Sequence, residues 1–198
     1  PPIKMNTIFQ SAMKLQEYFL ERGWKFCFAG GLAVQRWGEP RLTVDVDATL
    51  LTGFGKEEEF ARTLLAKYPA RRPDALEFSL RTRVLLLQDD QRVGLDIAFG
   101  ALPFESRVIQ RASYYDFWPG VSLLTCSAED LVVFKAFADR DRDWADIEGI
   151  MARRGVKLDL DLILAELKPL AELKESPGIM DKLSQKIAQS RAIRSDKP

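Results

Sequence analysis

The segment Thr43–Leu51, TVDVDATLL, constrains the fold more than any other stretch of this chain. β-Branched and polar residues alternate along it, which predicts a strand whose successive side chains point to opposite faces. Asp45 and Asp47 then share one face with Thr43. Aspartate is a poor strand former, so the alternative, that these are only the polar side of a half-exposed strand, requires a coincidence.

A third aspartate, Asp96, lies in the predicted strand Arg92–Phe99, which follows a predicted strand at Glu77–Leu87 and a hairpin turn over Gln88–Gln91. Pairing of the acid-bearing strands would bring the three carboxylates into one site. Carboxylates that converge repel one another and lose hydration unless a cation neutralises them. All-oxygen ligands favour Mg²⁺, with Mn²⁺ as the other candidate, and Mg²⁺ typically leaves positions open for substrate phosphates. The three aspartates therefore predict phosphoryl chemistry.

The 198 residues include no histidine, and 29 Lys and Arg balance 29 Asp and Glu. This excludes a Ser-His-Asp or Cys-His catalytic device and a His-ligated zinc site. With 46% hydrophobic and 29% charged residues, we expect a soluble globular protein. No apolar run reaches the about 18 residues of a membrane span, and no signal peptide is recognisable at the start, so we expect a cytoplasmic protein without a membrane partner. Cys27 and Cys126 are predicted to be buried small hydrophobes.

A glycine pair, Gly30-Gly31, follows the predicted strand Trp24–Ala29 and begins a predicted helix. Glycines at such a turn let backbone N–H groups approach phosphate oxygens at the positive end of a helix. The alternative is that they serve backbone torsion only. Arg41 and Thr43, just ahead of the aspartates, either orient phosphate or only flank the start of the strand.

From Ser127 onward the pattern is helical, with Ser127 as a predicted N-cap and predicted breaks at Gly155, Pro169 and Pro177-Gly178. Lys135 is the one charge in LVVFKAFA, and a lysine there either needs a partner or extends from the edge of a core helix into water. The run DRDRDWADIE, which includes Asp146, is typical of a solvated helix face.

Three stretches of this chain resemble motifs of one family: GGLAVQRWGEPRLTVDVD, GLDIAFG and SAEDLVVFKAFADRDRDWADIEGI. They are similar to the AbiEii-like branch of the polymerase-β-like nucleotidyltransferase superfamily, over about Phe26 to Ile150. The resemblance implies an α+β fold: a nucleotidyltransferase palm with a mixed sheet over residues 1–125, followed by a C-terminal helical bundle over 126–198 that packs on the active site.

The resemblance also implies roles for particular residues. Asp45, Asp47 and Asp96 would hold Mg²⁺, Gly30 and Gly31 would cradle the nucleoside triphosphate, Lys135 would contact it, and Asp146 would be an active-site carboxylate; these residues, with Arg41 and Thr43, are the candidate site. The pair is GG where many members of the superfamily have GS, so a serine hydroxyl contact to phosphate is missing.

The expected reaction moves a nucleoside monophosphate from a triphosphate to a hydroxyl acceptor, either an RNA or tRNA end or a protein. The resemblance also suggests the toxin of a toxin–antitoxin pair, with an antitoxin as a partner. The alternative is a non-catalytic nucleotide-binding or protein-interaction module that retains the fold. Five arginines either line a groove for an RNA acceptor or are solvated loop charges: Arg71, Arg72, Arg81, Arg83 and Arg92.

Overall fold

The computed structural model describes residues 7–195, and the chain forms two compact units. The sheet unit comprises the chain up to Leu32 and residues 42–126. The helical unit comprises residues 33–41 and the chain from Ser127 onward. The division after Cys126 lies one residue beyond the boundary expected from the sequence, and residues 33–41 join the helical unit.

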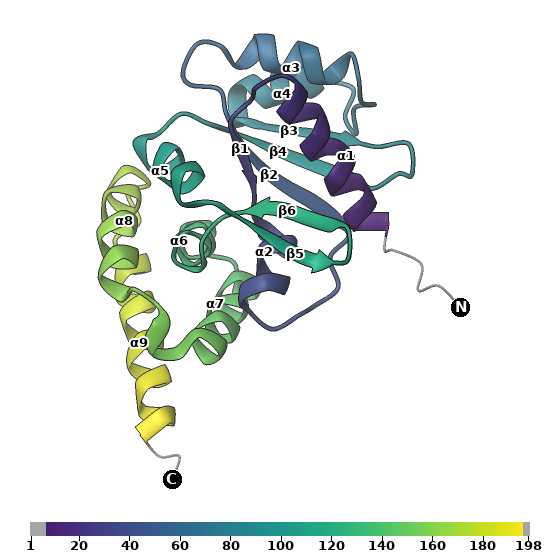
Figure 1. Cartoon of the computed structure of the whole chain (residues 1–198). Helices are drawn as coiled ribbons and strands as arrows, with labels where there is room; N and C mark the ends of the chain where they lie inside the picture. Colours follow the sequence, from purple (N-terminus) through teal and green to yellow (C-terminus); the bar gives the residue numbers. More distant parts are fainter. Residues whose placement is uncertain (1–6, 196–198) are drawn as a thin grey trace. The chain divides into compact units, whose positions relative to one another are not determined.

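The sheet unit is built on one mixed sheet of six strands in the order β3-β4-β2-β1-β6-β5 (Figure 1). The strands are β1 (Phe26–Phe28), β2 (Asp45–Leu51), β3 (Val84–Gln88), β4 (Gly94–Gly100), β5 (Ser113–Trp118) and β6 (Val121–Thr125). β2 is parallel to β4 and β1 is parallel to β6, whereas the other neighbouring pairs are antiparallel. The two acid-bearing strands, β2 and β4, are therefore direct neighbours, and the predicted hairpin between β3 and β4 is confirmed.

One face of this sheet forms the core of the sheet unit together with α1 (Thr7–Glu21), α3 (Glu57–Leu65) and α4 (Ala75–Thr82). The buried strand residues in this core are Phe26, Phe28, Val46, Ala48, Leu50, Leu85, Leu87, Leu95, Ile97, Phe99, Val121 and Leu123. A one-residue slip of register would expose these side chains, at about 1.5–3 kcal/mol each, and bury the aspartates instead. The core therefore determines which face of the sheet carries the acids.

The opposite face is partly covered by α5 (Pro103–Arg111), an element that the sequence analysis missed. The helix lies over the C-terminal ends of β2 and β4, where a Cβ on Gly100 would meet Glu105 at 3.1 Å and Thr49 at 3.3 Å. The Glu105 carboxylate accepts hydrogen bonds from the N–H groups of Ala101 and Leu102, at 2.9 and 2.6 Å, and so anchors the start of the helix. The aspartates are at the other end of these two strands.

The helical unit contains α6 (Ala128–Ala138), α7 (Asp141–Arg154), a short 3₁₀ turn η1 (Gly155–Lys157), α8 (Leu160–Leu173) and α9 (Gly178–Ser195). The helix α2 (Gly30–Trp37) begins in the sheet unit, and its residues from Ala33 belong to the helical unit. The N-cap predicted at Ser127 is confirmed, because its hydroxyl accepts a hydrogen bond from the Asp130 N–H at 3.0 Å. α6 packs against α7 and α8, and α9 packs against α7 and α8.

Two local predictions are wrong. The strand predicted over Glu77–Leu87 is instead α4 followed by β3, because Ala75 and Ser79, at i and i+4, form the buried side of a helix despite their small size. Arg83, in the left-handed region at φ 60°, ends that helix. Pro169 does not break α8, where the neighbouring Leu167 and Leu170 are buried and keep the helix packed through the proline.

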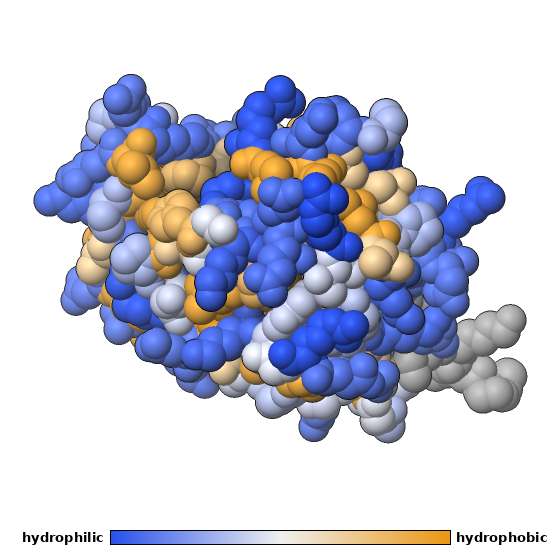
Figure 2. All heavy atoms as spheres, turned by 90° about the horizontal axis from the view of Figure 1, so that it is seen from above, coloured by the Kyte–Doolittle hydropathy of each residue, from blue (hydrophilic) through white to orange (hydrophobic). Residues whose placement is uncertain are grey.

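The surface is mainly hydrophilic on the face drawn in Figure 2, with separate groups of hydrophobic side chains between the charged ones. Cys27 and Cys126 are both buried, as predicted. Within residues 7–195, no helix combines the length and the apolar character that crossing a bilayer requires.

Candidate active site

The register of β2 and β4 brings the three predicted aspartates together. Asp47 is the direct cross-strand partner of Asp96, and Asp45 is the partner of Gly94. Side chains two residues apart on a strand point to the same face, so Asp45, Asp47 and Asp96 share the face away from the α1 core. The pairing of the two acid-bearing strands, on which the sequence prediction depended, is confirmed.

Three glycines make room for these side chains. A Cβ on Gly30 would overlap the Asp47 carboxylate, and one on Gly94 would overlap the carboxylate of Asp45. A Cβ on Gly31 would overlap the hydroxyl of Thr43, which itself donates a hydrogen bond to the Asp45 carbonyl at 3.1 Å. The glycines are therefore required by close packing around the carboxylates, and Gly30 also by its positive φ of 50°.

The Gly31 N–H donates to Asp47 Oδ2 at 3.3 Å, so the first turn of α2 directs a backbone donor toward the acidic cluster. This N–H is one of the groups at a helix start that lack an intrahelical acceptor. A donor of this kind, beside a cation site, is suited to a phosphate oxygen. The binding of phosphate by Gly30 and Gly31 stays a prediction.

Arg71 also lies at this acidic cluster, where the sequence analysis did not place it. Its guanidinium forms an ion pair with Asp96 and lies 3.6 Å from Asp45 Oδ1. Of the other arginines considered for an RNA groove, Arg72 pairs with Asp74 at 2.9 Å and Arg83 pairs with Glu57. Arg71 precedes Asp96 by 25 positions with no motif linking them, so no local signal identifies the contact.

The pKa of Asp96 is raised to about 6. Burial is the largest cause; the Arg71 guanidinium opposes it, and the neighbouring charges of Asp47 and Asp45 add to it. Burial and like charge both disfavour the ionised form of a carboxyl group. The site is thus negatively charged beyond what one arginine neutralises, and it favours an added cation.

The donor set fits a hard divalent cation in its chemistry. Three carboxylates lie on the same face of two adjacent strands, and oxygen ligands of this kind suit such an ion. The Arg71 guanidinium, itself a cation, already contacts two of them, Asp45 and Asp96. In the part of the chain that the structure describes, no three His, Cys, Asp or Glu side chains are grouped as a ready-made metal site. Because Arg71 lies against Asp45 and Asp96, we expect these side chains to rearrange before they share a metal ion.

A second charged cluster lies wholly within the helical unit. The Lys135 ammonium is 2.8 Å from Asp143 Oδ1 and 2.8 Å from Asp146 Oδ2. Arg41 donates two hydrogen bonds to Asp146, from Nε at 2.8 Å and from Nη2 at 2.9 Å. The side chains of Lys135, Asp143 and Asp146 are only 7%, 1% and 6% exposed. Both simpler interpretations, a lysine extending into water and a solvated helix face, are therefore wrong for these residues.

Burial raises the pKa of Asp146, but hydrogen bonds from Arg41 and Lys135 outweigh it and hold the pKa below its usual value. Burial likewise raises the pKa of Asp143, and hydrogen bonds from Arg140 and Lys135 bring it below the usual range. Both carboxyl groups are thus ionised in the folded unit at neutral pH. Arg41, Lys135 and Asp146 form a buried ion-pair network, and their action on a nucleotide stays a prediction.

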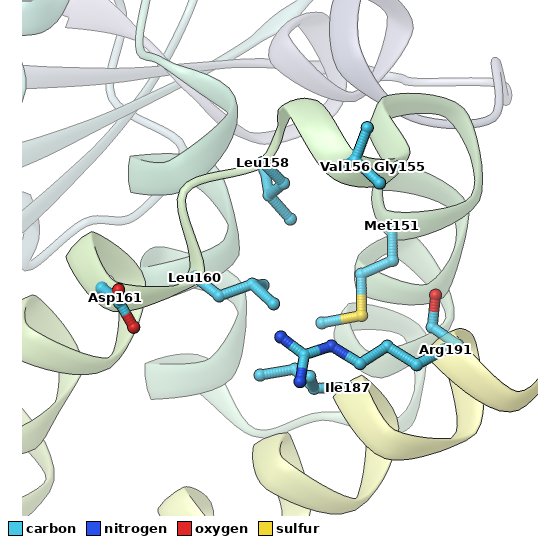
Figure 3. Close-up of a pocket in the computed structure, with 9 residues that line it drawn as sticks. Met151, Gly155, Val156, Leu158, Leu160, Asp161, Ile187 and Arg191 are labelled. Carbon is cyan, nitrogen blue, oxygen red and sulfur yellow. The ribbon is translucent and has the colours of Figure 1, made fainter.

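The helical unit also contains a pocket of about 460 Å³ between the end of α7, η1, α8 and α9 (Figure 3). Its walls include Met151, Leu158 and Ile187, and the Arg191 side chain extends between Met151 and Ile187. Asp161 also lines the pocket and is the acidic residue among its lining side chains. This pocket does not offer the acidic set that metal-assisted transfer requires, so the candidate active site is on the sheet.

Comparison with known proteins identifies the family and the fold of the chain. Residues 19–192 match the family described as "Nucleotidyl transferase AbiEii toxin, Type IV TA system". The fold is similar to an antigenic nucleotidyltransferase-like protein from Paracoccidioides brasiliensis, with TM-score 0.51, 13% identity, and coverage of 88% of this chain and 92% of that one. It is also similar to the antibiotic-resistance factor ANT(2'')-Ia, with TM-score 0.54, 16% identity, and coverage of 86% and 94%. No curated protein matches the sequence.

These structural likenesses show the fold, a nucleotidyltransferase-like α+β architecture with C-terminal helices. The family match extends over most of the chain and includes both the acidic strands and the helical motif. The chain therefore belongs to the AbiEii family of nucleotidyltransferase enzymes.

Proposed function

We propose that this enzyme uses Mg²⁺ to transfer a nucleoside monophosphate from a nucleoside triphosphate to a hydroxyl acceptor. The observation that carries this proposal is the register of β2 and β4, which pairs Asp47 with Asp96 and places Asp45 on the same face. A set of three carboxylates on adjacent strands is suited to Mg²⁺ and leaves positions for phosphate oxygens. Mn²⁺ has the same ligand preference and would replace it.

Asp45, Asp47 and Asp96 would hold the ion, which when bound neutralises phosphate charge and lowers the pKa of a coordinated hydroxyl. The Gly31 N–H, now directed to Asp47 at 3.3 Å, would turn to a phosphate oxygen with the N–H of Gly30. Thr43 holds the strand start through its bond to the Asp45 carbonyl at 3.1 Å. In this arrangement the sheet unit binds and orients the triphosphate.

The acceptor oxygen forms a bond to the α-phosphorus, the bond from the α-phosphorus to the bridging oxygen breaks, and pyrophosphate leaves with that electron pair. The acceptor hydroxyl loses one proton. Asp96 would accept it, since its pKa, raised to about 6, suits a general base near neutral pH.

For the helical unit, we propose that Lys135 and Asp146 act on the reaction together with Arg41, as their motif implies. Lys135 would contact the triphosphate in the nucleotide-bound enzyme, and Asp146 would hold Arg41 through its two hydrogen bonds. The test is Asp146→Asn, read as separate changes in kcat and KM and alongside a melting curve. A melting change with unaltered kinetics would contradict a role in transfer.

The direct test of the function is label transfer from each of four α-labelled nucleoside triphosphates to cellular RNA and protein, with and without Mg²⁺. We expect labelling by the wild-type enzyme, and a loss of about a hundredfold or more in Asp47→Asn. Asp90→Asn is the matched control, because Asp90 is exposed on the β3–β4 turn and pairs with Lys14 at 3.1 Å. No labelling of any acceptor would contradict the proposal and favour a non-catalytic module.

The family description supports a further part of the proposal, a toxin within a type IV toxin–antitoxin system. Modification of an RNA end, such as that of a tRNA, or of a protein would then arrest growth. We expect induction of the wild-type chain to stop cell growth and Asp47→Asn to permit it, at equal protein levels. Which fraction carries the label identifies the acceptor, and growth rescue by a co-expressed neighbouring gene identifies the antitoxin.

A further inference from the structure

The acidic site contains a cation of its own, the guanidinium of Arg71. Arg71 pairs with Asp96 and lies 3.6 Å from Asp45 Oδ1, so one guanidinium contacts two of the three carboxylates proposed as metal ligands. A guanidinium and a divalent ion compete for the same carboxylate oxygens.

The backbone of Arg71 is anchored independently of this ion pair. Residues 69–71 extend the sheet beside β3: Ala70 bridges Leu87, the Gln88 N–H donates to the Pro69 carbonyl at 2.9 Å, and the Arg71 N–H donates to the Leu86 carbonyl at 3.0 Å. Leu86 is in turn the cross-strand partner of Asp96, which is the partner of Asp47. Arg71 therefore lies in line with the two paired aspartates, and its side chain can move while its backbone stays.

Gly94, which has no side chain, leaves the space that the Arg71 guanidinium occupies. A Cβ on Gly94 would overlap the Asp45 carboxylate and lie 2.9 Å from Arg71 Nη1. The side chains of Arg71, Asp45 and Asp96 are 29%, 37% and 29% exposed, in contrast to the nearly inaccessible Lys135 network. An ion pair open to solvent at this level is exchangeable, because its partners regain hydration when they separate.

We propose that Arg71 is a built-in counter-ion that holds the carboxylates in the nucleotide-free enzyme and couples the binding of the divalent cation to the binding of the triphosphate. This inference rests on the proposed function of the same site. An incoming cation alone must displace Arg71 and leave its guanidinium without that partner. When triphosphate arrives with the cation, the guanidinium exchanges a carboxylate for a phosphate, a group that guanidinium binds well through two parallel hydrogen bonds. Each ligand then strengthens the other by the same factor.

The test measures Mn²⁺ binding by electron paramagnetic resonance, without nucleotide and with methylene-bridged analogues of the four triphosphates. In the wild type we expect the analogue to tighten Mn²⁺ binding. In Arg71→Met we expect Mn²⁺ alone to bind about tenfold tighter or more. A cation within about 4–6 Å of a carboxylate weakens its binding of another positive charge by that order, and the variant removes this cation. The added effect of the analogue should shrink to the same extent. Arg71→Lys, which keeps the charge and loses the planar fork, should fall between them.

Arg72→Met is the matched control, since Arg72 is adjacent and its guanidinium is paired with Asp74 at 2.9 Å and 3.0 Å. Its Mn²⁺ binding should equal that of the wild type. Equal or weaker Mn²⁺ binding in folded Arg71→Met, verified by circular dichroism, would overturn the inference. If Arg71→Met fails to fold, Arg71→Lys decides by the same comparison: tighter Mn²⁺ binding supports the inference and unchanged binding overturns it.

The two proposals fail in different ways. Label transfer by the wild type with unchanged Mn²⁺ binding in Arg71→Met overturns the counter-ion and leaves the proposed function standing. Tighter Mn²⁺ binding in Arg71→Met without label transfer to any acceptor supports the counter-ion and contradicts the proposed function.

Discussion

Replacing Lys135 by Met tests the buried network of the helical unit. Met preserves most of the apolar stem and removes the ammonium group, which lies 2.8 Å from both Asp143 and Asp146. The two carboxylates remain buried after the change, at 1% and 6% exposure. Each therefore loses one of its charged partners without regaining water.

Removing one partner of a buried ion pair costs about 3–5 kcal/mol. Here Asp146 keeps the two hydrogen bonds of Arg41, and Asp143 keeps Arg140 at 2.5 Å. We therefore expect Lys135→Met to lower the free energy of unfolding by about 3 kcal/mol, the lower end of this range. For a unit of this size, that loss corresponds to a fall in Tm of about 12 °C or more.

The assay is scanning calorimetry, because a chain with two compact units need not unfold in one step. The matched control is Lys182→Met, which removes the same charge from a solvent-open pair with Asp139 at 3.1 Å in the same unit. Lys182→Met should lower the free energy of unfolding by about 1 kcal/mol or less, including the loss of the ammonium contact with the Trp144 ring at 4.6 Å. A loss for Lys135→Met no larger than that of Lys182→Met would refute the reasoning.

Three further predictions concern single side chains and pH. Gly31→Ala should lower the free energy of unfolding by about 1–3 kcal/mol and reduce nucleotide transfer, because the new Cβ overlaps Thr43. Melting curves measure the first effect and label transfer measures the second. Ser127→Ala should cost about 1 kcal/mol through loss of the N-cap of α6, measured by urea unfolding. The lowered pKa values of Asp143 and Asp146 mean that the unfolded chain binds more protons near pH 4. Their stabilisation is therefore complete above about pH 5 and is lost as pH falls through the lowered values, which urea unfolding at a series of pH values measures.

One control variant and two contradicting outcomes distinguish these specific effects from a general loss of stability. Gly178→Ala adds a Cβ that meets nothing within 4 Å, so it should leave stability and transfer unchanged. Asp146→Asn should flatten the acid part of the pH curve, and an unaltered slope would contradict the assignment. Equal melting curves for Gly31→Ala and the wild type would show that the close packing at Thr43 is relaxed in solution.

The acidic site was predictable because its signals are local. Alternation in TVDVDATLL places Asp45 and Asp47 on one face, and a glycine pair after a short apolar strand indicates the turn into α2. The strand Glu77–Leu87 was predicted wrongly, because Leu76, Phe78 and Leu80 alternate as in a strand while the buried side of α4 consists of small residues. Periodicity weighs large apolar residues and misses a helix whose buried side is Ala75 and Ser79.

The sequence by itself determined the chemistry of the carboxylates and the face on which two of them lie, since both follow from residue type and from the two-residue repeat of a strand. Only the tertiary structure decided which strands are neighbours, and hence that Asp96 is opposite Asp47. It also decided that Arg71 pairs with Asp96 and that Asp146 is buried against Lys135 and not solvated. These contacts depend on the packing of distant segments, which no short-range pattern encodes, because an ion pair forms wherever the fold brings opposite charges together out of water.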